Sequence, residues 1–106
     1  MPSAALSCLT TGASERPAYP EDSLRRKDGG TVKLELEFAG PDAPPRVTVL
    51  NENVTFEALT DATRRYVAGF RIPCIAPGSP PVRLRQDYVF VPNDGRKVMS
   101  SRPVDL

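Results

Sequence analysis

Residues 56–73, FEALTDATRRYVAGFRIP, carry the longest helical pattern of the chain and decide how the rest must pack. Their apolar and half-apolar side chains recur at the i, i+3, i+4, i+7 spacing of one buried helix face. These side chains are Phe56, Leu59, Thr63, Tyr66, Val67 and Phe70. Thr55 can cap the first turn with its hydroxyl, and Pro73 ends the pattern because proline cannot continue the helical hydrogen-bond ladder. We therefore predict a long helix that covers a sheet formed by the other segments.

Composition limits both the size of the protein and its range of partners. A chain of 106 residues forms one small domain with a thin core. Its 14 basic and 13 acidic residues nearly cancel, which argues against a protein that binds nucleic acid or an anionic membrane through net charge. The sequence has no apolar run of about 18 residues, the length that a membrane-spanning helix needs.

The sequence offers little for a metal site. It contains no histidine, which is the commonest metal ligand and the usual base of a catalytic triad. The two cysteines, Cys8 and Cys74, match no zinc-binding spacing. They are either two free thiols or one disulfide, and the disulfide would indicate an oxidising compartment. We expect no metal and no cofactor.

An enzyme would have to use Cys74 as a nucleophile, or Glu57 and Asp61 as an acid and a base. Cys74 has no histidine to activate its thiol. Glu57 and Asp61 are four residues apart on the predicted helix, where we expect both to be solvated. The sequence therefore favours a protein that is not an enzyme.

Two elements are predicted before the first strand, a flexible tail and a short helix. Residues 1–15 are small and polar without periodicity, which predicts a flexible N-terminal tail. Residues 20–28 predict a short helix in which Pro20 is the first helical residue. Gly29 or Gly30 would supply its left-handed stop.

Three stretches alternate in the manner of half-buried strands: residues 31–38, 46–50 and 82–91. The first has the cleanest apolar face, so we place it in the middle of an antiparallel sheet of order 2-1-3. With both helices on one face, this is a two-layer α+β sandwich. The third strand would have an open edge. After a turn at residues 92–95, residues 93–106 form either a C-terminal tail or a short, weak fourth strand.

Several of these pieces, in this order, resemble the C-terminal domain of TonB-family energy transducers, over residues 16–92. The resemblance is carried by Tyr19-Pro20, the basic end of the short helix, Gly30-Thr31-Val32, Val47 and Val49, Ala58-Leu59, Arg64-Arg65, residues 70–73 and residues 81–90. Family members carry an inner-membrane helix, a proline-rich spacer and this domain in the periplasm. The domain contacts outer-membrane receptors that import iron chelates and other nutrients, and passes them energy from the proton gradient.

The sequence departs from the family pattern in two places. Arg16 stands where the family has glutamine before Pro-x-Tyr-Pro, and the aromatic pair before the final proline is reduced to Phe70, with Tyr66 one turn earlier. No membrane helix or spacer is recognised, so we expect either an excised domain or a free-standing relative. Association with a membrane would then need a segment that lies elsewhere.

The resemblance implies a periplasmic domain that binds an outer-membrane TonB-dependent receptor, or another envelope protein, by strand addition to the third strand. The implied partner-binding residues are Arg16, Pro17, Tyr19, Pro20, Val82, Arg83, Leu84, Arg85, Gln86, Asp87 and Tyr88. The open edge equally allows a homodimer. The alternative function is a free-standing envelope adaptor or assembly protein that has the same fold and transduces no energy.

Two groups of these residues have a second interpretation. Tyr19 and the neighbouring prolines would bind the partner, or would only anchor the first helix. Arg83 and Arg85 would pair with acidic receptor residues, or would protect an exposed edge strand from aggregation.

Overall fold

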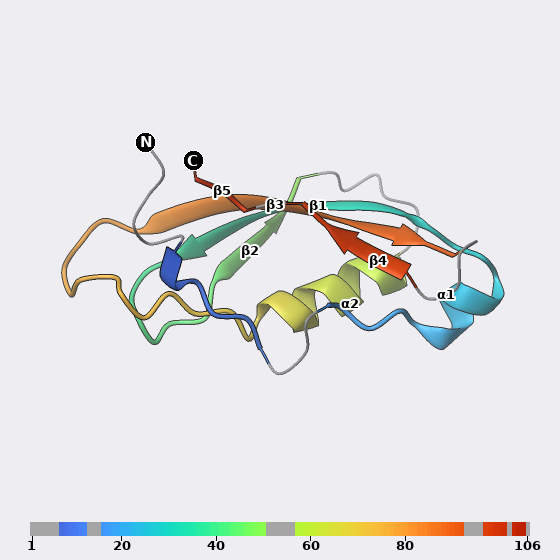
Figure 1. The fold of residues 1–106 in the computed structure, drawn as a ribbon, viewed down its shortest axis with the longest axis horizontal. Coiled ribbons are helices and arrows are strands. Elements are labelled where there is room, and N and C mark those ends of the chain that lie inside the picture. Colours follow the sequence, from blue (N-terminus) through green and yellow to red (C-terminus); the bar gives the residue numbers. More distant parts are fainter. Residues whose placement is uncertain (1–6, 13–15, 51–56, 93–96, 102, 106) are drawn as a thin grey trace.

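The computed structural model describes residues 7–12, 16–50, 57–92, 97–101 and 103–105. The elements follow in the order α1 (Glu21–Arg25), β1 (Gly30–Phe38), β2 (Arg46–Val49), α2 (Glu57–Val67), β3 (Val82–Val91), β4 (Lys97–Ser100) and β5 (Val104–Asp105). Figure 1 shows one twisted sheet with both helices on the same side of it. The predicted α+β sandwich of two layers is confirmed.

The sheet has the order β2-β1-β3-β4, and β5 also pairs with β3. All pairs are antiparallel. The strand with the cleanest alternation, β1, lies between β2 and β3 as predicted, with Leu36 opposite Val47 on one side and Leu84 on the other. Its apolar face is fully removed from solvent, as expected of a strand with neighbours on both sides and a helix below. The buried residues of β1 are Val32, Leu34, Leu36 and Phe38.

The core lies between this face of the sheet and α2. Leu59, Thr63 and Val67 form the buried stripe of α2. Thr63 is accommodated in this apolar environment because its hydroxyl donates a hydrogen bond of 2.8 Å to the carbonyl oxygen of Leu59. The loop after α2 contributes further buried residues: Phe70, Ile72 and Ile75.

The main helix ends at Val67, earlier than the predicted end at Pro73. The chain leaves the helix through a tighter turn, in which the N–H groups of Gly69 and Phe70 donate to carbonyls three residues back (3.3 and 2.9 Å). Arg71 then pairs with the N-terminal segment. The backbone N–H of Thr10 donates to the carbonyl of Arg71 (2.8 Å), and the N–H of Arg71 donates to the carbonyl of Thr10 (3.0 Å). This pairing holds Arg71 against the N-terminal segment, outside the helix. The predicted cap at Thr55 and the first apolar residue Phe56 lie outside the described residues, as does most of the predicted turn at residues 92–95.

The short helix also differs from its prediction at both ends. Pro20 is the extended N-cap residue (φ −61°, ψ 135°), and the helix begins at Glu21. At the other end, Lys27 has the left-handed conformation (φ 59°) that we expected of Gly29 or Gly30. The N–H of Asp28 donates to the carbonyl of Ser23 (2.8 Å). This bond, with the left-handed residue before it, is the pattern of a Schellman motif, which closes the helix without glycine.

Residues 7–12 are joined to the body of the domain, although the sequence indicated a free tail here. Of the two alternatives for the cysteines, the structure contains the disulfide between Cys8 and Cys74, with 6.3 Å between the Cα atoms. Leu9 packs against the core. Thr10 adds the backbone pairing with Arg71 described above.

Candidate functional site

The outer edge of β3 is where sequence reasoning placed partner binding, and the structure covers it. β1 pairs with one side of β3 from Val82 to Phe90. On the other side, β4 pairs with the Tyr88–Val91 end and β5 pairs with Leu84 and Arg85. The expected open edge is therefore wrong, and the alternative of a short fourth strand is confirmed by β4. The cause is that residues 97–101 and 103–105, here called the C-terminal segment, fold back as two short strands (red beside orange in Figure 1).

The pairing of the C-terminal segment with β3 is interrupted in the middle. Tyr88 lies opposite Ser100, and Arg85 lies opposite Val104. The C-terminal segment thus uses one more residue than β3 over the same distance, which is the count of a β-bulge. The four residues of β4 and the two of β5 are therefore separate short ladders on a strand of ten residues.

Ser101 bridges the interruption through both its backbone and its side chain. Its N–H donates to the carbonyl of Asp87 (2.9 Å), and its hydroxyl accepts a hydrogen bond from the N–H of Asp87 (2.8 Å). The carbonyl of Ser101 is thereby free to accept from Nε2 of Gln86 (2.9 Å). Oε1 of Gln86 in turn accepts from the hydroxyl of Tyr88 (2.8 Å).

These contacts explain a polar residue on an apolar face. Gln86 and Tyr88 are 7% and 1% exposed, and a buried amide needs partners for both its donor and its acceptor. One partner is Tyr88, and the other is supplied by the C-terminal segment. Burial, with a smaller effect of Tyr66, raises the pKa of the Tyr88 hydroxyl above its ordinary value, so this donor stays protonated.

The apolar attachment of the C-terminal segment is small. Val98 lies opposite Phe90 and is 3% exposed. Met99 and Val104 are 47% and 57% exposed. Among the side chains of this segment that the structure describes, Val98 is the only buried one. The segment is thus held by one apolar side chain and a group of hydrogen bonds.

The charged residues of β3 lie on the sheet face that points away from the helices, and they are paired within the domain. Arg83 contacts Glu35 of β1 at 2.9 Å, and its Nε lies 4.0 Å from Glu37. Arg85 lies 3.8 Å from Asp87. All of these pairs are partly exposed, so their contribution to stability is small. Both arginines keep enough exposure to contact a partner across this face.

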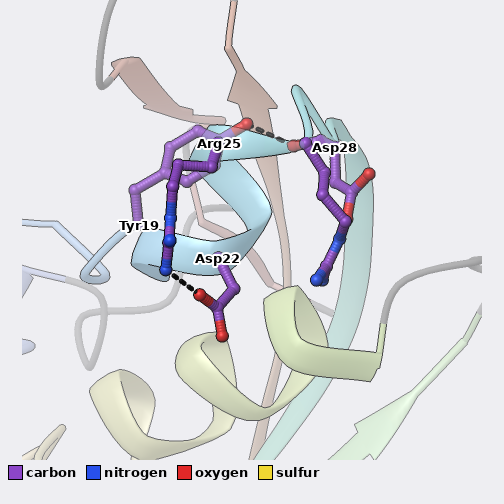
Figure 2. Close-up of polar contacts among 5 residues, drawn as sticks. Tyr19, Asp22, Arg25 and Asp28 are labelled. Carbon is purple, nitrogen blue, oxygen red and sulfur yellow. Dashed lines mark hydrogen bonds and ion pairs between the residues drawn. The ribbon is translucent and has the colours of Figure 1, made fainter.

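The predicted binding residues before α1 lie on the helix side of the sheet. Pro17 is buried. The hydroxyl of Tyr19 donates to the carbonyl of Asp28 (Figure 2), and its ring packs on Phe90. Burial and the nearby Asp28 raise the pKa of Tyr19. With Pro20 as the N-cap, these contacts fit the interpretation in which Tyr19 and the prolines anchor α1. Figure 2 also shows the ion pair of Arg25 with Asp22 on the same helix.

Arg16 is exposed and lies next to α2. It lines an open cavity of about 240 Å³ together with Ala18, Ala62, Arg65 and Tyr66. Arg16 is therefore separate from the outer edge of β3, and the structure divides the predicted binding residues between two places.

Comparisons of the chain with protein-family models, with curated proteins and with solved structures found no match. Within the described ranges, no group of three His, Cys, Asp or Glu side chains is placed to hold a metal ion. No helix in the same ranges combines the length and apolar character needed to span a bilayer.

Sequence reasoning missed β5 and the role of Ser101. One signal for them existed: Gln86 interrupts an otherwise apolar strand face, and such an amide requires a hydrogen-bonding partner. The sequence could indicate that a partner was needed, but the identity of Ser101 depends on the fold.

Proposed function

We propose that this chain is a protein-interaction domain of the bacterial periplasm, similar in role to the C-terminal domain of TonB-family energy transducers. In this proposal it binds an extended segment of an outer-membrane receptor by strand addition along β3. The complex would support energy-dependent uptake of nutrients such as iron chelates. The domain itself performs no chemical step.

The observation that carries the proposal is the unequal pairing on the two sides of β3. The ten residues of β3 are paired over nearly their whole length with β1. Among the described residues, its other side holds only two short, separate strands. An extended peptide can replace such a cover, because the edge offers the same main-chain hydrogen bonds to any strand. The C-terminal segment would leave when the receptor segment arrives, so it also keeps the edge from pairing with unrelated chains.

The disulfide supports the compartment in this proposal. Disulfides form and persist in oxidising compartments such as the bacterial periplasm. The bond between Cys8 and Cys74 holds the N-terminal segment to the loop after α2, and neither cysteine belongs to β3 or to the C-terminal segment. The edge can therefore exchange strands while this attachment stays closed.

A lock on the C-terminal segment tests the proposal. Val89 and Met99 lie directly opposite each other, and opposite residues are close enough for a disulfide. The Val89→Cys/Met99→Cys chain, oxidised, would hold β4 on β3. Binding is measured with synthetic peptides that cover the periplasm-facing N-terminal segments of outer-membrane receptors from the same genome.

We expect the unlocked parent to bind at least one such peptide, with amide NMR shifts along β3 and in the C-terminal segment. The locked chain should bind at least about tenfold more weakly, because the edge is not released. The Val89→Cys single variant is the matched control and should behave like the parent. Equal binding by the locked chain would place the contact elsewhere, and no binding by the parent would contradict the proposal.

A further inference from the structure

We infer that the C-terminal segment is a template for the partner, and that β3 prefers an extended segment with a small or β-branched apolar residue followed three positions later by serine or threonine. This inference rests on the proposed strand addition and specifies the chemistry of the segment that β3 accepts. It follows from two positions of the C-terminal segment, Val98 and Ser101, and from the residues that they satisfy.

The first position is that of Val98. Its side chain is 3% exposed and belongs to the core cluster, and it is paired with Phe90. A partner that carries a polar or charged residue here would bury it without compensation. A much larger side chain would have to displace packed core residues. Valine or a residue of similar size therefore fits best.

The two positions between Val98 and Ser101 place little restriction on the side chains of the partner. Met99 and Ser100 are both exposed, and Met99 lies opposite Val89 on the face of the sheet away from the helices. A side chain here can be exchanged without loss of a buried contact. These two positions therefore act as spacers between the specific ones.

The second specific position is that of Ser101. In an ordinary antiparallel pair the N–H of Asp87 would donate to the carbonyl of the residue opposite. Here the Ser101 hydroxyl accepts this bond (2.8 Å), and the Ser101 carbonyl accepts instead from Gln86 (2.9 Å). One residue thus satisfies two donors of β3.

A residue without a side-chain acceptor cannot do this. Alanine or valine at this position would leave the N–H of Asp87 or the amide of Gln86 without its present partner. Gln86 is 7% exposed, so an unpaired donor there is costly. Serine and threonine both place a hydroxyl at the β-carbon and so meet the requirement. A partner that displaces the C-terminal segment must meet it too, because Gln86 and Asp87 stay on β3.

Peptide exchange on the full chain tests this preference. A specific protease site inserted between Gly95 and Arg96 allows the folded chain to be cut, so that residues 96–106 stay bound only by non-covalent contacts. Fluorescent peptides with the sequence of residues 96–106 then compete for β3, and their affinities are read by anisotropy. All substitutions are made in the peptide, so the folding of the domain is unchanged.

The parent peptide should exchange into the cut chain. The Val98→Asp peptide should bind at least about 30-fold more weakly, because a carboxylate would enter the core. The Ser101→Ala peptide should lose about 3- to 15-fold, the effect of one or two hydrogen bonds, and Ser101→Thr should restore the affinity. The matched control Met99→Ser should remain within about twofold.

The outcomes separate the two proposals. If all peptides bind equally, strand addition is retained and the template inference is wrong. If Ser101→Ala binds like the parent while Val98→Asp does not, the requirement for serine or threonine is overturned. If even the parent peptide fails to exchange, β3 accepts no added strand, and the inference falls together with the proposed function.

Discussion

The ring of Tyr19 packs edge-on against the ring of Phe90, with 5.3 Å between the ring centroids and an interplanar angle of 82°. Such a geometry is favourable for two aromatic rings. Phe90 is also paired with Val98 in the sheet. The residues before α1 and the C-terminal segment are therefore both attached to the same end of β3.

We predict that Tyr19 stabilises the fold and is not needed to bind a partner. Tyr19→Ala should lower the free energy of unfolding by about 2 kcal/mol, because the ring leaves a half-buried site. Tyr19→Phe should cost about 1 kcal/mol, since it removes only the hydrogen bond to Asp28. Urea unfolding measures both values. A Tyr19→Ala chain with parental stability and lost peptide binding would show the opposite role.

Tyr88 should make the protein less stable in alkaline solution. Its hydroxyl has a raised pKa in the folded chain, mainly because it is buried. In the unfolded chain a tyrosine loses its proton near pH 10, so above this pH the folded state binds more protons than the unfolded state. The free energy of unfolding must then fall as the pH rises.

The Tyr88→Phe variant isolates this effect. At neutral pH it should be less stable than the parent, because Oε1 of Gln86 loses its donor. Between about pH 9 and pH 11 its stability should fall less steeply than that of the parent. Reversible urea unfolding at several pH values gives both slopes. Identical slopes would mean that Tyr88 is not the group whose ionisation matters.

Leu36 should be among the least replaceable residues of the core. It is 1% exposed and lies on the apolar face of β1 between β2 and β3. Leu36→Asp should prevent folding, because it buries an unpaired carboxylate, and Leu36→Ala should cost about 3 kcal/mol. Glu37→Gln, on the opposite face, is the control and should change stability by less than about 1 kcal/mol. Circular-dichroism melts compare them, and a near-parental melt for Leu36→Asp would contradict this placement.

The strands could be predicted from the sequence because apolar and polar residues alternate along each of them. Residues 82–91 and the central position of β1 follow from such patterns, and the structure agrees with them. The ends of the helices could not be predicted in the same way. The apolar periodicity continues to Phe70, but the chain leaves the helix after Val67 and then pairs with Thr10, which lies far away in the sequence.

The candidate site likewise has one feature that the local pattern predicts and one that depends on the fold. In the alternation of residues 82–91, Gln86 shares a face with Leu84 and Tyr88, and all three side chains are buried. The partner of Gln86 was not predictable, because the one-residue shift between β4 and β5 determines which carbonyl reaches it. The few apolar residues of the C-terminal segment suggested a weak strand. The structure adds a hydrogen-bonded bridge at Ser101 that such a count does not include.

The disulfide should contribute substantially to stability. It closes a loop with a sequence separation of 66 residues, for which the loss of chain entropy in the unfolded state corresponds to about 4 kcal/mol. We expect reductant, or the Cys8→Ser/Cys74→Ser variant, to lower the free energy of unfolding by about 3–4 kcal/mol. Alkylation followed by mass spectrometry identifies the oxidised form. Two alkylatable thiols in protein isolated from periplasm would contradict the bond.

Removal of the C-terminal segment is the most direct change at the edge of β3. Without residues 96–106 the domain should still fold, because β1, β2, β3 and α2 supply most of the core. Its free energy of unfolding should fall by about 2–3 kcal/mol, from the loss of Val98 burial and the bonds of Ser101. The uncovered edge of β3 should then pair with whatever strand is available.

Two measurements follow from this truncation. Sedimentation should detect dimers of the truncated chain, and a peptide with the sequence of residues 96–106 should bind the truncated chain but not the full one. The matched control removes only residues 103–106, which deletes β5 and leaves β4 and Ser101 in place. It should behave more like the parent, because the buried Val98 and the bridge to Gln86 remain. If both truncated chains sediment as monomers and neither binds the peptide, the C-terminal segment does not guard this edge, and the partner must bind elsewhere.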